Sequence, residues 1–308
     1  MPCAREIGAG LAGWLRANQD ASGRVRDPVH GEYGEYADGC AALALGLMAL
    51  QSGEPSWIEP YRRALKIATQ RPPYSEFDWL ALLLLAAAVA DHPEGARHLS
   101  RELPQAHRIQ PYRGRRVVSH NWVAMRAATY SLRARLTDSP KDRKEAENLW
   151  RQVLRWQDSA GWFSDAPGGI ATPITYHAKF SAMVAVAVDE GSDCNPALAP
   201  ALLRGLDWML PLVSPAGVLA PYGRSRHSLF GYAAAILAFR RGAARFSRPE
   251  FAAAAEHLVQ RVGEFQRPDG HIPCVLNGGE AERLDWDVYV NNPDYNAYAA
   301  ALFLLGPG

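Results

Sequence analysis

The sequence has few cysteines, little net charge and no hydrophobic run long enough to cross a membrane. Its four cysteines are far apart in 308 residues and form no CxxC pair, so we expect reduced thiols without a disulfide framework. The formal net charge is only +1, which excludes a general electrostatic attraction for nucleic acid or an anionic membrane. The apolar run at residues 80–90 is well short of the roughly 20 residues that a bilayer span requires. It therefore predicts a buried helix.

The motifs of metal and nucleotide chemistry are also missing. The sequence contains no HExxH, no cysteine–histidine cluster, no EF-hand loop and no Gly-rich fingerprint after a strand, so we expect no metal and no cofactor. Residues 1–10 include Arg5 and Glu6 but no long apolar segment. From this we expect no signal peptide and a cytoplasmic protein, with neither nucleic acid nor membrane as a partner.

What the sequence does contain is a repeated pair of helical segments. A helix-period segment ends in a Gln-x-x-x-Gly turn, a loop rich in Gly, Pro and Tyr follows, and then comes a more apolar helix. The offset is the same in three pairs: Gln19/Gly23, Gln157/Gly161 and Gln266/Gly270. Glycine suits the left-handed turn that ends a helix, so we assign these glycines to helix ends.

About six such hairpins follow one another, at a spacing of several tens of residues. The first helix of a pair carries Arg, Lys and Glu on one face, whereas the second is rich in Ala, Leu and Val around its whole circumference. No segment shows sustained strand alternation. The pattern predicts an all-α fold, an (α/α)6 toroid of outer and inner helices, in one domain that spans residues 1–308.

In such a toroid the inner helices point the same way, and their N-termini surround one mouth. The positive ends of their dipoles gather there and favour anions. The residues at these helix starts are polar and aromatic beyond what capping alone requires. Those that we predict to bind a substrate are Tyr36, Glu76, Asp78, Trp122, Asp165, Tyr222, Arg224 and Arg226.

Two of the helix starts carry a family resemblance. The segment SHNWVAMRAA contains Asn121, and GWFSDAPGGIATPITYHAKF contains Tyr176 and His177. Together with the Gln-x-x-x-Gly turns, they resemble the helical domain of the heparinase II/III-like and alginate-lyase-like polysaccharide lyases. Those lyases usually add a C-terminal β-sandwich to the cleft, whereas this sequence stops after its last predicted helix. We therefore expect either that the substrate is small or that a partner subunit completes the site.

The resemblance implies β-elimination at a uronic acid. Asn121, helped by His120, would hold the substrate carboxylate and stabilise the enolate-like charge. Tyr176 would be the proton shuttle, acting as acid to the leaving glycosidic oxygen and also as a candidate base. His177 or His120 would be the alternative base, because imidazole titrates near neutrality.

The partner that the resemblance implies is an acidic, uronate-containing saccharide. Arg224 and Arg226, in the segment YGRSRHS, would bind its carboxylate or a sulfate through paired hydrogen bonds. The sequence indicates neither the sugar nor the oligomeric state.

Three other functions stay open beside elimination. A glycoside hydrolase of the unsaturated uronyl type would need two carboxylates; the candidates are Asp38, Glu76, Asp78, Asp165, Asp285 and Asp287. A terpenoid-cyclase-like toroid would need an Asp-rich acid motif, to which LDWDVY comes nearest. A non-catalytic carbohydrate-binding protein would use the aromatic residues but would not depend on Tyr176 or His177.

Overall fold

The computed structural model describes residues 2–28, 30–34, 36–70, 76–92, 99, 119–165, 172–189, 195–223, 225–276 and 292–306. Within these ranges the regular elements are all helices, and extended residues pair only in isolated bridges. The predicted all-α class is confirmed.

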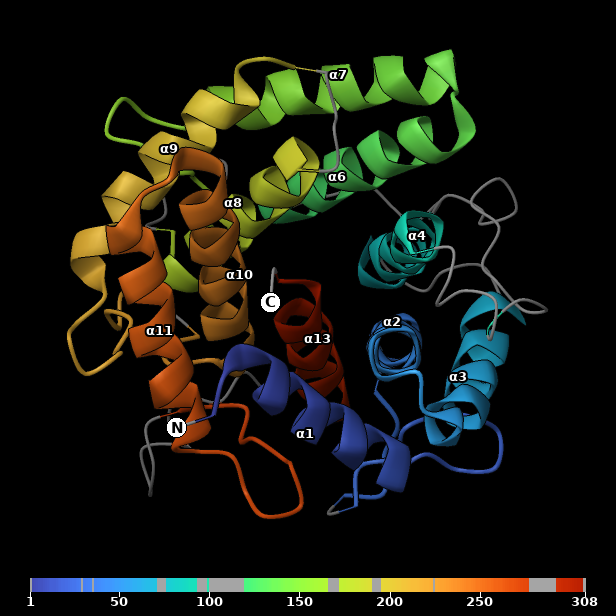
Figure 1. The fold of residues 1–308 in the computed structure, drawn as a ribbon. Coiled ribbons are helices and arrows are strands. Elements are labelled where there is room, and N and C mark those ends of the chain that lie inside the picture. The colour runs from blue at the N-terminus through green and yellow to red at the C-terminus, as the bar shows by residue number, and fades with distance from the viewer. Residues whose placement is uncertain are drawn as a thin grey trace.

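The apolar helices form an inner ring (Figure 1). In chain order they are α2 (Ala37–Ser52), α4 (Glu76–Asp91), α6 (His120–Thr137), α8 (Ile174–Asp189), α10 (Leu229–Phe246) and α13 (Asn292–Leu305). Each packs against the next, and α13 packs against α2, so the ring is closed.

A second layer of helices surrounds this ring. It consists of α1 (Ala4–Ala17), α3 (Ile58–Gln70), α7 (Pro140–Arg155), α9 (Leu198–Met209) and α11 (Pro249–Gly263), with the 3-10 turns η1 (Pro55–Trp57) and η3 (Leu210–Leu212) beside them. The sixth outer helix that we predict, between α4 and α6, falls outside the described residues. The alternation of outer and inner helices is that of the predicted (α/α)6 toroid.

Hydrophobic patterning explains which helix lies in which layer. In α7 the buried residues are Asp142, Ala146, Leu149, Trp150 and Val153, whose spacing (i, i+4, i+7, i+8, i+11) places them in one stripe along the helix. In α8, by contrast, every residue from Ile174 to Ala187 is buried. A helix with one apolar stripe covers a core, whereas a helix that is apolar on all sides has to lie inside it.

The glutamines of the repeated turns join neighbouring outer helices. The side-chain amide of Gln19 donates hydrogen bonds to the carbonyls of Gly23 and of Pro60 in α3, both at 3.0 Å. Gln157 does the same with Gly161 (2.9 Å) and Ala201 of α9 (2.8 Å). Gln266 reaches Gly270 and, at 3.1 Å, the carbonyl of Ile7 in α1. This last bond links the final hairpin to the first.

The glycines of these turns have a different role from the one that we predicted. Gly23, Gly161 and Gly270 lie beyond the ends of α1, α7 and α11 and have φ angles of +102°, +106° and +90°. A Cβ on any of them would collide with a backbone carbonyl of the next outer helix. The glycine therefore permits close approach between hairpins and does not end a helix.

Candidate functional site

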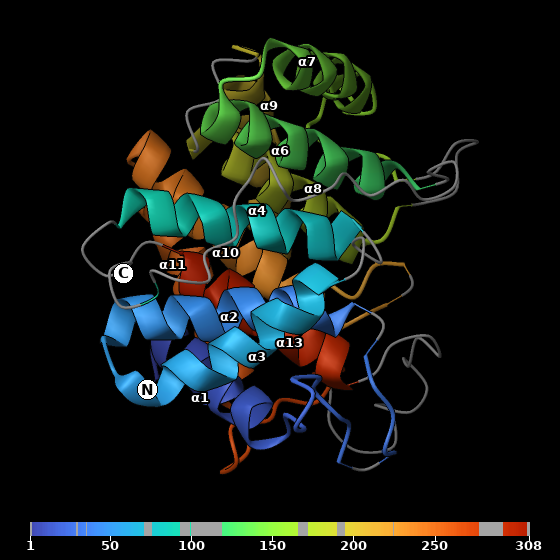
Figure 2. The same ribbon diagram turned by 90° about the vertical axis from the view of Figure 1, so that its right-hand side faces the viewer.

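The inner helices all begin on the same side of the molecule (Figure 2). Each has at least one aromatic side chain in its first two turns or directly before its first residue, and we call this set the mouth aromatics: Tyr36, Phe77, Trp122, Tyr176, Phe230, Tyr295 and Tyr298. They form one continuous cluster, with ring-centroid distances of 5.4 Å between Tyr36 and Phe77 and 4.8 Å between Phe230 and Tyr295.

Several of these contacts cross the centre of the ring. Phe77 of α4 lies 5.2 Å from Tyr298 of α13, although α2 separates these two helices around the ring. Tyr36, at the start of α2, similarly contacts Trp122 of α6 across α4. Side chains from non-adjacent inner helices can meet only over the central axis. The mouth aromatics therefore converge over the ring centre, and Tyr36, Phe77, Trp122 and Tyr295 keep part of their surface accessible.

A lysine lies among them. Lys179 of α8 is 2% exposed, and its Nζ atom is 3.9 Å from the ring centroid of Phe77. Burial lowers the pKa of Lys179 to about 7, although the carboxylates of Asp165 and Glu76 oppose this shift. Among the described residues, no carboxylate lies within ion-pair distance of this amine.

Glu76, which we predicted to bind substrate, is buried at the first position of α4. One carboxylate oxygen accepts hydrogen bonds from Arg126 of α6, with an Nε distance of 2.8 Å. The other oxygen, Oε2, has no hydrogen-bond partner in the described part of the chain. Burial raises the pKa of Glu76, although Arg126 and Lys179 oppose this shift. The free oxygen can accept a proton or a hydroxyl hydrogen bond.

Asp165 and Asn121 form a pair at the start of α6. The Oδ1 atom of Asp165 accepts hydrogen bonds from the backbone N–H of Asn121 (2.9 Å), from its side-chain amide (2.6 Å) and from the Ser119 hydroxyl (3.1 Å). The Asn121 amide also donates to Ser119, and its Oδ1 atom is buried without a partner among the described groups. The predicted carboxylate-binding role needs free N–H donors. In this structure Asn121 offers an acceptor, which suits a hydroxyl or N–H donor.

Asp78 and Asp294 hold the start of α2 from both sides. Asp78 of α4 accepts the N–H of Gly39 at 2.9 Å, and Asp294 of α13 accepts the N–H of Tyr36 at 2.7 Å. Asp38 lies 3.6 Å from Arg24. These bonds satisfy N–H groups that a helix N-terminus leaves unpaired. Asp78, which we predicted to bind the substrate, therefore has a structural role at the mouth.

The two histidines of the predicted site have different environments. His177 is fully buried; its Nδ1 accepts the Phe163 N–H (3.2 Å), and its Nε2 donates to the Gly205 carbonyl of α9 (3.0 Å). Burial lowers its pKa to about 4. His177 thus joins α8 to α9 and has no ring nitrogen left for a substrate.

His120 is partly accessible, and one of its ring nitrogens is available to a substrate. Its ring stacks on Trp156 with a centroid distance of 3.7 Å, and its Nδ1 lies 2.8 Å from the Ser164 carbonyl. A neutral ring that donates through Nδ1 presents Nε2 as an acceptor. This nitrogen is a candidate proton acceptor at the start of α6.

Two of the predicted residues before α10, Tyr222 and Arg226, lie toward the outside. The carbonyl of Tyr222 accepts the N–H of Ile174 at the start of α8, but its ring, 48% exposed, faces Trp162. Trp162 in turn stacks on Trp208 of the outer helix α9. Arg226 is exposed. Arg224, Asp285 and Asp287 lie outside the described residues.

Sequence reasoning missed Phe77, Phe230, Tyr298 and Arg126, and it gave Lys179 no role. A signal for the aromatic residues exists, because aligning the inner helices by their first residue places an aromatic side chain in the first turn of five of the described helices and directly before the sixth, α2. The signal for Lys179 is its position as the only charged residue in the segment ITYHAKFSAMVAVAV.

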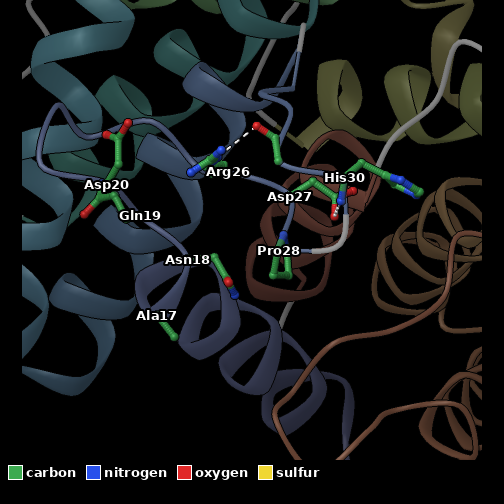
Figure 3. A pocket seen from close by; sticks show the side chains of 9 residues that line it. Ala17, Asn18, Gln19, Asp20, Arg26, Asp27, Pro28 and His30 are labelled. Carbon is green, nitrogen blue, oxygen red and sulfur yellow. Dashed lines mark hydrogen bonds between the residues drawn. The ribbon is translucent and has the colours of Figure 1, made fainter.

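A separate pocket of about 470 Å³ lies beside the loop that follows α1 (Figure 3). Its walls include Asn18, Asp20, Arg26, Asp27 and His30. The buried carboxylate of Asp27 accepts a hydrogen bond from Asn292, the first residue of α13, at 3.2 Å. The pocket therefore borders the mouth on the side of the first hairpin. The described residues contain no group of three metal-ligating side chains, and none of the described helices is long and apolar enough to span a bilayer.

Comparisons with known proteins agree with this architecture. No protein-family model matches the sequence, and no curated protein matches it significantly. Solved structures do match over nearly the whole chain. A sugar epimerase from a ruminal bacterium has a TM-score of 0.70 at 9% identity and covers 98% of this chain and 98% of its own.

Two further structures differ in the chemistry that their names state. A glycosyl hydrolase family 88 protein from Bacteroides vulgatus has a TM-score of 0.63 at 11% identity, covering 98% of this chain and 99% of its own. A polysaccharide lyase has a TM-score of 0.63 at 12% identity, covering 98% and 96%. At such low identity these likenesses concern the fold alone. What they show is that the chain adopts the (α/α)6 toroid fold.

Proposed function

We propose that the protein is a saccharide-modifying enzyme with its active site at the mouth of the inner ring, and that it cleaves an acidic saccharide by β-elimination. The observation that carries this proposal is the set of mouth aromatics at the starts of the inner helices, together with three buried titratable groups beside them: Lys179 contacts Phe77, Glu76 precedes Phe77 in the chain, and Asp165 is bonded to Asn121, the neighbour of Trp122. Largely apolar sites with a few convergent polar groups are the usual setting for small-molecule chemistry.

The chemistry of the similar folds supports a sugar as the substrate. The names of the three matching structures, a sugar epimerase, a glycosyl hydrolase and a polysaccharide lyase, all denote proteins that act on saccharides. Elimination from a uronate and epimerisation beside a carbonyl group share their first step, the removal of a proton next to a carbonyl carbon. A site with proton-transfer groups under an aromatic surface suits that step.

Tyr176 is the proton donor in this proposal. It lies in the first turn of α8 with its ring 5.9 Å from Phe230, and it is 7% exposed. Its hydroxyl would protonate the leaving glycosidic oxygen while the bond to carbon breaks. The Oδ1 atom of Asn121 and the Oε2 atom of Glu76, which have no hydrogen-bond partner among the described residues, would accept hydrogen bonds from sugar hydroxyls.

The test is a panel of uronate-containing glycans, followed by ultraviolet absorbance and by reducing ends in the same reaction. Elimination creates a conjugated double bond with each cleavage, so both signals should rise together. Tyr176→Phe should lower kcat by about 10²–10⁴-fold, the usual contribution of a general acid. Tyr130→Phe is the matched control, because Tyr130 packs on Trp79, outside the set of mouth aromatics. Absence of both signals on every glycan would refute the proposal.

Hydrolysis is the second candidate. It is favoured by the raised pKa of Glu76 at the start of α4 and by the carboxylate of Asp165, which is bonded to Asn121 at the start of α6. A hydrolase needs an acid and a base carboxylate on the two sides of the scissile bond. Reducing ends without absorbance would select this reaction.

A further inference from the structure

Lys179 occupies an unusual position for a charged side chain. It follows Tyr176 by three residues on α8, in a stretch where every residue from Ile174 to Ala187 is buried. Its amine reaches Phe77 of α4, although α6 separates α8 from α4 around the ring. The lysine therefore extends toward the central axis, beneath the mouth aromatics.

The groups around this amine come from several elements. Glu76 of α4 is bonded to Arg126 of α6, Asp165 is bonded to Asn121 of α6, and Cys40 lies on α2. Phe230 of α10 packs on Tyr176, three residues before Lys179, whereas α9 lies on the side of His177. Glu76 and Asp165 each accept hydrogen bonds from other donors through one carboxylate oxygen, and no carboxylate of the described residues lies within ion-pair distance of the amine.

A buried ammonium without a counter-ion is costly, and the neutral amine is the form that burial favours. The shift of the Lys179 pKa to about 7 expresses this cost. Buried lysines of this kind can act as general bases, because a useful fraction is deprotonated at neutral pH.

Helix geometry places this base beside the proposed acid. Residues three apart on a helix share a face, so Tyr176 and Lys179 point toward the same side of α8, while His177 points to α9. Two proton-transfer groups on one helix face can act on neighbouring atoms of one substrate.

We propose that the Lys179 amine is the base that removes the substrate proton next to the carboxylate. This assignment rests on the proposed function. The C–H bond breaks as an N–H bond forms, and the electron pair moves into the carboxylate. The pair then forms a carbon–carbon double bond while the C–O bond breaks, and Tyr176 gives its proton to the departing oxygen. Proton transfer from the ammonium to the Tyr176 phenolate restores both groups.

The first test is kinetic. In the wild type, kcat/KM should increase with pH through about 7, because only the neutral amine accepts a proton. Lys179→Arg keeps the charge but cannot deprotonate, and Lys179→Met removes it; each should lower kcat by about 10²–10⁴-fold with little change in KM. Lys144→Met, at an exposed position of α7, is the control and should behave like the wild type.

The second test separates a base from a packing role. Small primary amines should restore part of the activity of Lys179→Ala, and the restored rate should depend on the pKa of the added amine. A residue that only fills space would show no such dependence. Circular dichroism and melting curves establish that each variant folds.

The outcomes distinguish the two proposals. An active wild type whose Lys179→Met and Lys179→Arg variants retain their kcat would overturn the base assignment and leave the elimination intact. A wild type that releases no unsaturated product from any uronate would overturn both.

Discussion

Two basic side chains on α8, Lys179 and His177, are both fully buried, yet they face opposite directions. Lys179 extends toward the ring centre and lacks an ion-pair partner in the described residues, whereas both ring nitrogens of His177 are bonded to backbone groups. In both cases burial lowers the pKa. Each therefore makes the stability of the fold depend on pH, in separate pH ranges.

Lys179→Met should stabilise the protein, most strongly at low pH. The unfolded lysine binds a proton below its ordinary pKa of 10.5, and the folded one binds it only below about 7. The free energy of unfolding of the wild type therefore rises between these pH values, and below pH 7 the full penalty of burial is present, on the order of 5 kcal/mol. Urea titrations should show that the variant's advantage shrinks as the pH rises. The control Lys144→Met should differ from the wild type by an amount that does not vary with pH. The same behaviour in Lys179→Met would contradict the prediction.

His177 should make the wild type sensitive to acid. The unfolded histidine takes up a proton below 6.5 and the folded one only below about 4, so stability is lost as the pH falls through this range. The expected loss is roughly 3 kcal/mol. His177→Gln cannot titrate; it should be less stable at neutral pH, because contacts with Phe163 and Gly205 are weakened, but its stability should vary less between these pH values. Equal pH dependence in both proteins, measured by urea unfolding, would count against the assignment.

At the scale of elements, the repeated turns decide how closely adjacent hairpins approach. Gly161 has a φ of +106°, and a Cβ there would meet the Arg204 carbonyl of α9. Gly53 also has a positive φ, +66°, but a Cβ there would meet nothing within 4 Å. The two positions separate backbone strain from steric collision.

Gly161→Ala should therefore destabilise the protein much more than Gly53→Ala. Backbone strain alone costs roughly 1–2 kcal/mol, and the collision at Gly161 should raise the loss to about 3 kcal/mol or more. Thermal and urea unfolding of the two variants provide the measurement. Similar losses at both glycines would mean that close contact with α9 is unimportant.

The sequence predicts the elements well but not the direction of their side chains. The stripe of α7 and the uniform apolarity of α8 are sufficient to assign outer and inner helices, because burial on one side and burial on all sides leave different patterns. The same uniformity hides which face of α8 points inward. His177 and Lys179 therefore could not be told apart, and the orientation of the Asn121 amide depends on Asp165, which is distant in the sequence.

For the molecule as a whole, stability and the site both depend on closing the ring. Closure joins α13 to α1 and α2, and α13 supplies Tyr295 and Tyr298 to the mouth and Asp294 to the start of α2. A substitution at the seam between the first and last hairpins should therefore alter the mouth, because it would displace α13 and the residues that α13 supplies there. Gly8 marks this seam, because a Cβ there would lie 2.9 Å from Leu304 of α13.

Gly8→Val should open the seam, whereas Gly13→Ala on the same helix should strengthen α1. Overpacking at Gly8 is expected to cost about 1–3 kcal/mol, and the displaced α13 should also lower turnover in the proposed reaction. A Cβ at Gly13 would meet nothing within 4 Å, so alanine there should add about 0.5–1 kcal/mol through helix propensity and leave turnover unchanged. Urea unfolding and kcat measured on both variants provide the comparison. If Gly8→Val lowers stability but keeps full turnover, the mouth does not depend on the position of α13, and the contribution of Tyr295 and Tyr298 to the site has to be abandoned.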